Sequence, residues 1–142
     1  MKQEIMNSEK MIEMFTYTIT SQLPIEQIAE KVPAACEQNK FALLYTYVYH
    51  DIVANKGFPI KRKVFIYEVC QAKTAADMLT DFPHFSIFMP CKLSIYEENG
   101  TVAVSTMNME MMLNAIGSNE KLFTEASSLF NTLKKVMDEI SK

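Results

Sequence analysis

Two of the three cysteines have neighbours that could support chemistry. Cys70 follows Glu68 in an apolar run, and Cys91 lies between a proline and Lys92. The thiolate is the form of cysteine that acts as a nucleophile or a soft-metal ligand, and a nearby lysine favours it. We therefore expect Cys91 to react faster than the third cysteine. The first four candidates for one ligand-binding pocket are Cys70, Cys91, Glu68 and Lys92.

Three further residues, His50, Asp51 and Cys36, are assessed from their positions in predicted helices and strands. His50 and Asp51 follow a predicted strand, where functional sites often lie, so we add both to the candidate ligand-binding set. Cys36 lies near the end of a predicted helix and beside Glu37. Both features disfavour a thiolate, so Cys36 is expected to react more slowly. Buried, purely structural cysteines are the alternative interpretation for all three thiols.

A methionine cluster offers a second chemistry. Four of the 11 methionines fall within six residues, at Met107, Met109, Met111 and Met112. Thioethers bind Cu(I), but methionine is also a common filler of cores, and we favour packing. The apolar stretch 107–116 would leave an exposed patch on a monomer, which favours a homodimer.

Composition and missing motifs exclude several function classes. The 14 Lys and Arg residues against 17 Asp and Glu residues give a net charge of -3, and Arg62 is the single arginine, so we expect no nucleic-acid partner. The chain has neither an apolar run of membrane-spanning length nor a signal peptide, which predicts a cytoplasmic protein with no membrane partner. Its cysteines lack zinc-site spacing, and the common nucleotide-binding, zinc-protease and hydrolase motifs are absent. The sequence indicates no metal, leaves any cofactor unknown and leaves open whether a reaction is catalysed.

The hydrophobic pattern predicts one α+β domain over residues 11–142, after a polar lead over residues 1–10. Strands are predicted over 11–20, 41–49 and 64–70, and helices over 24–38, 51–56, 72–81 and 120–140. Two more strands follow from Phe85, joined by a turn at Asn99 and Gly100. Pro33 is expected to bend or interrupt its helix. Because helices and strands do not alternate strictly, we predict a mainly antiparallel sheet with helices packed on one face.

The cysteine segments also carry a family resemblance. Residues 64–113, with E-V-C-x-A followed by F-M-P-C-K-L-S-I-Y-E-E-N-G-T-V-A-V, resemble the family called domain of unknown function 302, and weaker similarity runs from about Met14 through Gly57. Cys70 and Cys91 match the cysteines of the family's Cys-Asn-Pro and Leu-Pro-Cys patterns, although neither pattern is complete here. The resemblance implies a β-α-β4-α domain similar to one repeat of the TATA-binding-protein fold, often a homodimer, with no settled activity.

Three functional hypotheses follow. The first is a small-ligand or thiol- or soft-metal-handling binding protein that uses Cys70 and Cys91. The alternative is a homodimeric interaction module with purely structural cysteines. An enzyme with a cysteine nucleophile ranks last, because the sequence assigns no base and no orienting partner. A structure discriminates the first two, and for the first we expect the two cysteines on adjacent strands beside a common cavity.

Overall fold

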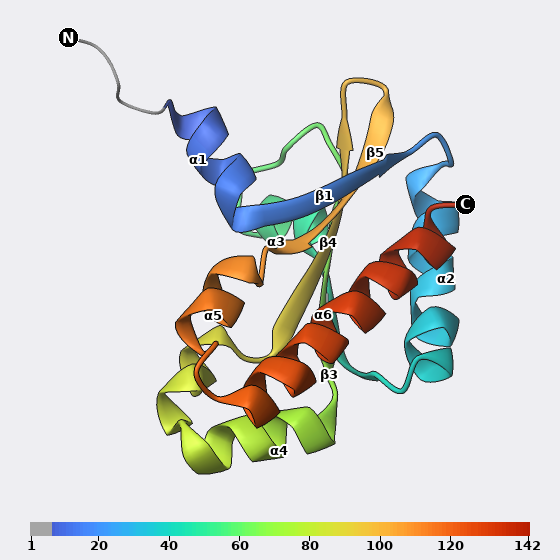
Figure 1. The fold of residues 1–142 in the computed structure, drawn as a ribbon. Coiled ribbons are helices and arrows are strands. Elements are labelled where there is room, and N and C mark those ends of the chain that lie inside the picture. Colours follow the sequence, from blue (N-terminus) through green and yellow to red (C-terminus); the bar gives the residue numbers. More distant parts are fainter. Residues whose placement is uncertain (1–6) are drawn as a thin grey trace, which may run out of the picture.

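The computed structural model describes residues 7–142 as a five-stranded sheet with helices (Figure 1). The strands are β1 Thr16–Ser21, β2 Ala42–Val48, β3 Val64–Cys70, β4 Cys91–Glu98 and β5 Thr101–Met107. The helices are α1 Ser8–Phe15, α2 Ile25–Gln38, α3 Tyr49–Asn55, α4 Ala72–Asp81, α5 Glu110–Ala115 and α6 Glu120–Ile140, and η1 Pro83–Phe88 is a 3₁₀ helix.

All neighbouring strands of the sheet are antiparallel. Their order is β1-β5-β4-β3-β2, so the first strand lies beside the last. Asn99 and Gly100 have φ angles of 51° and 82° and join β4 to β5. Both values lie in the left-handed region that a two-residue hairpin of this kind requires. The predicted hairpin turn and the predicted antiparallel sheet are confirmed.

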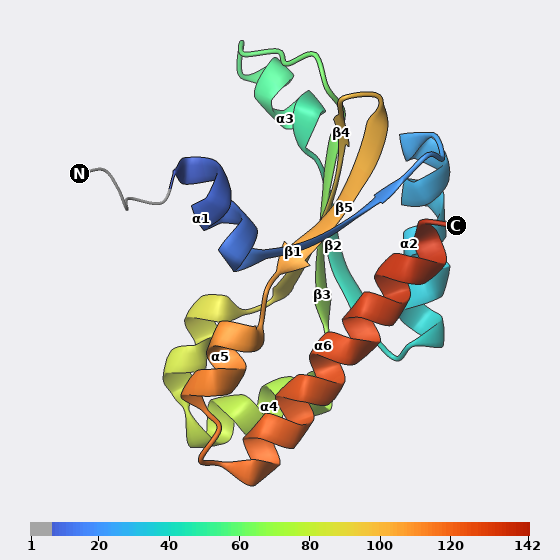
Figure 2. The ribbon, with the colours of Figure 1, turned by 45° about the horizontal axis from the view of Figure 1, so that its top comes forward.

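Helices cover one face of this sheet. In both ribbon views α2 and α6 run side by side across it, with α4 packed against the first half of α6 (Figures 1 and 2). Inward side chains of alternating strand residues, such as Leu93 and Ile95, are fully buried beneath them. Along α6 the buried positions recur every three or four residues from Leu122 to Ile140, as predicted. The predicted packing of helices on one face is confirmed.

The N-terminal prediction was wrong over 11–15. This segment belongs to α1, and the strand begins only at Thr16. The Asn7 side chain accepts a hydrogen bond of 2.9 Å from the Lys10 amide and so caps the helix. This local cap favours a helical turn over extended backbone. The first part of the predicted polar lead, residues 1–6, lies outside the described residues.

Two other boundaries differ from the prediction. The apolar run from Phe85 begins as η1, and β4 starts only at Cys91, after Pro90. Pro83 suits the first turn of a helix, and Pro90 lacks the amide that a ladder hydrogen bond needs. Pro33 does not interrupt α2, which runs to Gln38.

Across residues 7–142, none of the helices combines the length and the apolar character needed to span a membrane.

Candidate functional site

Cys70 and Cys91 lie on adjacent strands and border one cavity. Cys70 is the last residue of β3, and Cys91 is the first residue of β4, where it pairs with Val69. Regular alternation would turn Cys70 to the opposite face from Cys91. Because the chain leaves the sheet at Cys70 and enters α4, both side chains still border the same space.

This space, which we call the cysteine cavity, has a volume of about 280 Å³ and an almost entirely apolar wall. It lies between the ends of β3 and β4, the inner side of α4 and one residue of α6. Its lining residues are Leu44, Val69, Cys70, Gln71, Thr74, Ala75, Met78, Leu79, Met89, Pro90, Cys91 and Leu129. No charged side chain is among them, so a ligand here meets sulfur, carbon and two small polar groups.

Burial is the largest influence on the pKa of Cys91. It raises the pKa of Cys91 from 9.0 to about 11, and the neighbouring Cys70 adds to the rise, whereas the opposing effect of Lys92 is the smallest of the three. The expectation that Lys92 would activate Cys91 was therefore wrong in its net direction. Burial also raises the pKa of Cys36, which lies on the buried face of α2 and is 1% exposed.

Glu68 and Lys92 lie on the other face of the sheet. Their residues pair directly across β3 and β4, and Lys92 Nζ lies 3.3 Å from Glu68 Oε2. Tyr47 donates a 2.9 Å hydrogen bond to the other oxygen of Glu68, which raises the pKa of the Tyr47 hydroxyl. Neighbouring residues of a strand face apart, so this network and Cys91 are separated by the sheet itself.

His50 and Asp51 lie at the opposite end of β3 from Cys70. His50 is in the first turn of α3, where its Nδ1 accepts a 3.0 Å hydrogen bond from the amide of Val64, the first residue of β3. Asp51 Oδ1 is 3.9 Å from the other ring nitrogen. Of the six candidate residues, the structure brings Cys70 and Cys91 to this cavity, and Lys92 borders a second hollow that Cys91 also lines.

The sequence missed the methionines that complete the cavity wall. Met78 comes from α4 and is 4% exposed, and Met89 comes from the segment between η1 and β4. A second hollow of about 200 Å³, which we call the outer cavity, shares Met89 and Cys91 with the cysteine cavity. It is lined by Ile87, Phe88, Met89, Pro90, Cys91, Lys92, Thr106, Met107 and Met109. The sequence carries no local signal that places Met78 in the core or beside a cysteine.

The predicted exposed patch over 107–116 is largely absent. Met109, Leu113 and Ile116 are buried, because α5 packs against α6, whereas Met107 and Met111 remain exposed. Packing, rather than an open thioether surface, accounts for most of this stretch.

Asp77 of α4 lies beside Glu125 of α6, where the two helices pack together. Asp77 accepts a 2.9 Å hydrogen bond from Lys73, which lowers its pKa, while burial and the nearby Asp77 raise the pKa of Glu125 on α6. Two ionised carboxylates have no proton to share. Among residues 7–142, Glu125 Oε2 is buried without a hydrogen-bond partner, which a proton on Glu125 would supply. Asp77 belongs to α4, which forms one wall of the cysteine cavity, so this contact lies next to the candidate site.

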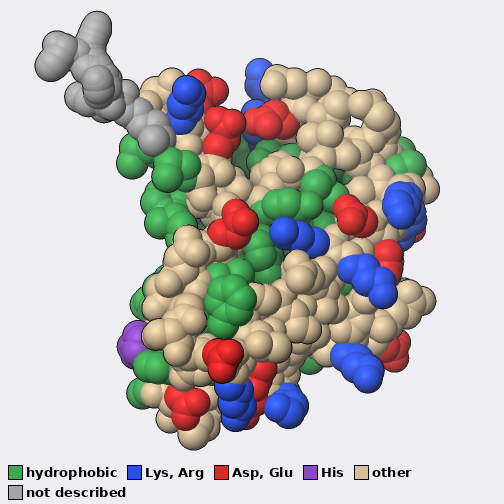
Figure 3. All heavy atoms as spheres, in the orientation of Figure 1, with side chains coloured by type: hydrophobic (Ala, Val, Ile, Leu, Met, Phe, Trp, Pro, Cys, Tyr) green, Lys and Arg blue, Asp and Glu red, His purple; other side chains and the backbone are tan. Residues whose placement is uncertain are grey.

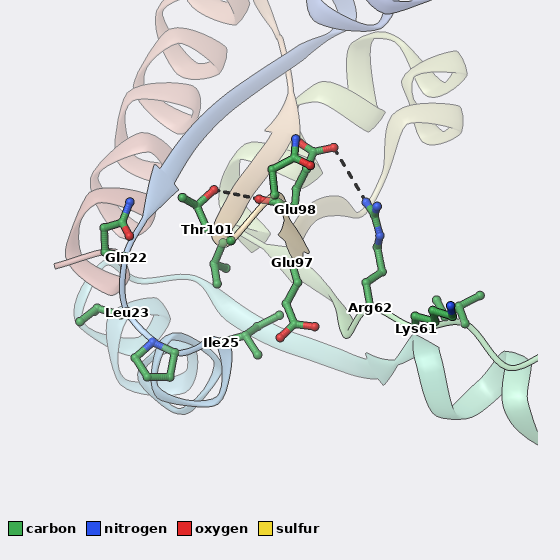
Figure 4. Close-up of a pocket in the computed structure, with 13 residues that line it drawn as sticks. Gln22, Leu23, Ile25, Lys61, Arg62, Glu97, Glu98 and Thr101 are labelled. Atoms are coloured by element: carbon green, nitrogen blue, oxygen red, sulfur yellow. Dashed lines mark hydrogen bonds and ion pairs between the residues drawn. The ribbon is translucent and has the colours of Figure 1, made fainter.

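A larger, more polar hollow lies at the far end of the sheet (Figure 4). Its volume is about 640 Å³, and it opens beside the β4–β5 turn and the start of α2. Arg62 reaches toward Glu98 at 3.8 Å, and the Glu97 carboxylate points into the space beside Ile25. Lys61, Arg62 and Glu98 are exposed, and the half-buried Glu97 accepts a 2.8 Å hydrogen bond from the Lys63 amide, so the hollow has no unpaired buried charge aimed at a ligand.

Comparison with known proteins identifies the family. The family model described as domain of unknown function DUF302 matches residues 17–140. The chain belongs to the DUF302 family. A crystal structure of an uncharacterised conserved DUF302 protein from Bacillus stearothermophilus is similar, with a TM-score of 0.77 and 26% sequence identity, over 91% of this chain and 99% of that one. No curated protein matches this DUF302 chain.

Proposed function

We propose that this DUF302 protein binds a small, uncharged ligand in the cysteine cavity, with Cys70 and Cys91 as the groups that contact it. The observation that carries the proposal is that both thiols border one cavity without charged walls. Ligand sites are typically concave, mostly apolar and furnished with a few polar groups. A polar ligand, or a charged one whose charge no thiolate neutralises, would lose its hydration here without gaining partners.

The size of the cavity supports a ligand of about one ring. An apolar cavity of about 150 Å³ inside a protein stays dry and binds benzene, and the cysteine cavity is larger. Gln71 and Thr74 provide the only polar side chains apart from the thiols. We therefore expect shape and sulfur contacts, rather than ion pairing, to set selectivity.

The test is a titration with toluene, monitored through the amide chemical shifts in two-dimensional NMR spectra. Toluene should shift signals of α4 and of the segment around Met89. Ala75→Leu fills the cavity and should abolish these shifts, whereas Ala76→Leu, on the exposed side of the same helix, should leave them unchanged. Shifts that persist in Ala75→Leu, or none in the parent protein, would refute this proposal.

A homodimeric interaction module is the second candidate, and α1 is the observation that favours it. Met11, Ile12, Met14 and Phe15 are between 48% and 61% exposed, and no residue of α1 is buried. Figure 3 shows apolar side chains gathered at this corner of the molecule. The sheet face opposite α2 and α6 carries the exposed Tyr45. A second copy of the chain would cover these apolar groups.

Light scattering across a tenfold dilution tests the dimer. A dimer should show twice the 16.3 kDa chain mass, and Ile12→Glu should return it to one chain mass. Phe123→Glu, on α6 at the opposite face of the sheet, is the matched control and should remain dimeric. A parent protein of one chain mass at every concentration would exclude this function.

A further inference from the structure

Sulfur atoms gather around the cysteine cavity. Cys70, Cys91, Met78 and Met89 all line it, from three parts of the chain: the end of β3, α4 and the segment that leads into β4. The outer cavity adds Met107 and Met109, and Met89 and Cys91 belong to both hollows. The thioether cluster seen in the sequence is thus joined to the cysteine pair by the fold.

The donor set selects among metals. Among residues 7–142, no group of three or more His, Cys, Asp and Glu side chains is placed to hold a metal ion. Zinc prefers four such ligands, and calcium and magnesium prefer oxygen. Thiolate with thioether is instead the set that binds Cu(I).

Charge balance in the cavity leads to the same cation. An ion in an apolar wall is costly unless its charge is compensated. A monovalent cation reacts with one thiol as M⁺ + RSH → RS–M + H⁺, and the proton passes to solvent. The product is neutral, and neutral thioethers and a second thiol can complete the coordination without adding charge. No redox step is required, because the cation enters and remains in its d¹⁰ state.

We propose that the sulfur atoms of Cys70, Cys91, Met78 and Met89 form a binding site for one Cu(I) ion. The site rests on the proposed function, because it uses the same cavity. The outer cavity supplies a route from solvent, since it is lined both by the exposed Met107 and by the buried Met109. Met89 and Cys91 stand where the route meets the site.

The test is anaerobic competition of the full chain with the coloured Cu(I)–bicinchoninate complex. We expect one Cu(I) per chain. Cys70→Ser and Cys91→Ser should each weaken binding by at least about 100-fold, and Met78→Leu combined with Met89→Leu by about 10-fold or more. Met111→Leu, an exposed thioether outside both cavities, should change nothing.

Circular dichroism verifies that each variant is folded. If a serine variant fails to fold, the Met78→Leu and Met89→Leu variant still tests the site, because leucine preserves the volume of methionine. Absence of competition, or Cu(I) binding unchanged in both cysteine variants, would overturn the copper site. Toluene separates the two proposals. Binding of toluene without Cu(I) defeats only the copper inference, whereas failure of both ligands defeats the proposed function as well. Displacement of toluene by Cu(I) supports both.

Discussion

Replacing Glu125 by glutamine should stabilise the protein at neutral pH. The Glu125 carboxyl faces Asp77, and Lys73 and Lys121 are the cations nearby. In Glu125→Gln the side-chain amide can donate a hydrogen bond to the Asp77 carboxylate. A neutral amide then replaces the buried carboxylate oxygen that has no partner in the parent protein. An unsatisfied buried acceptor costs about 1–3 kcal/mol, and the partial exposure of this contact favours the low end, about 1 kcal/mol.

The pH dependence follows from the direction of the pKa shift. The pKa of Glu125 is raised above 4.5, first by burial and then by Asp77. A carboxyl with a raised pKa keeps its proton in the folded state after the unfolded chain has lost it. The parent protein therefore loses stability as pH rises from about 4.5 through the folded pKa. The advantage of Glu125→Gln should be full at pH 7 and should vanish below about pH 4.

Thermal unfolding followed by circular dichroism measures both parts. For 142 residues the unfolding entropy is roughly 300 cal/mol/K, so about 1 kcal/mol raises Tm by about 3 °C at pH 7. Glu30→Gln, on the exposed side of α2, is the control and should shift Tm by less than about 1 °C at either pH. A variant that melts no higher than the parent at pH 7, or an equal gain at pH 4, would refute the reasoning.

Three further predictions concern the thiols and the hairpin. Iodoacetamide at neutral pH, with labelling followed by mass spectrometry, should label Cys70 first and Cys36 last. A pKa of about 11 leaves Cys91 about 100-fold less thiolate than an ordinary thiol, and Cys36 is in the core. Early labelling of Cys36 would contradict this order. Lys92→Met should change the labelling rate of Cys91 by less than about twofold and the free energy of unfolding in urea by less than about 1 kcal/mol. The reason is that the Lys92 ammonium pairs with Glu68 on the other face of the sheet. A larger change in the labelling rate would show that Lys92 activates Cys91. Gly100→Ala should lower stability by about 1–2 kcal/mol in the same urea assay, because φ is 82° there, and an unchanged midpoint would argue against the turn.

Much of the fold is written in local sequence patterns. The three- and four-residue spacing of apolar side chains predicted α6 with its observed ends, and Asn99 with Gly100 predicted the hairpin. Both signals depend on neighbours in the chain, so the amino-acid order suffices to read them. The same reasoning failed over 11–15, where aromatic and β-branched residues resemble a strand but a cap at Asn7 begins a helix.

The composition of the site was decided by tertiary structure. The sequence by itself indicated Cys70 and Cys91 as a pair, because each lies at the end of an apolar run that should join one sheet. It could not show that strand alternation turns Glu68 and Lys92 to the other face, since that depends on where β4 begins. Nor could it place Met78 in one cavity with Cys91, because that cavity exists only when α4 packs across the ends of β3 and β4. Burial, which raises the pKa of Cys91 against the pull of a neighbouring lysine, is likewise a property of the packed domain alone.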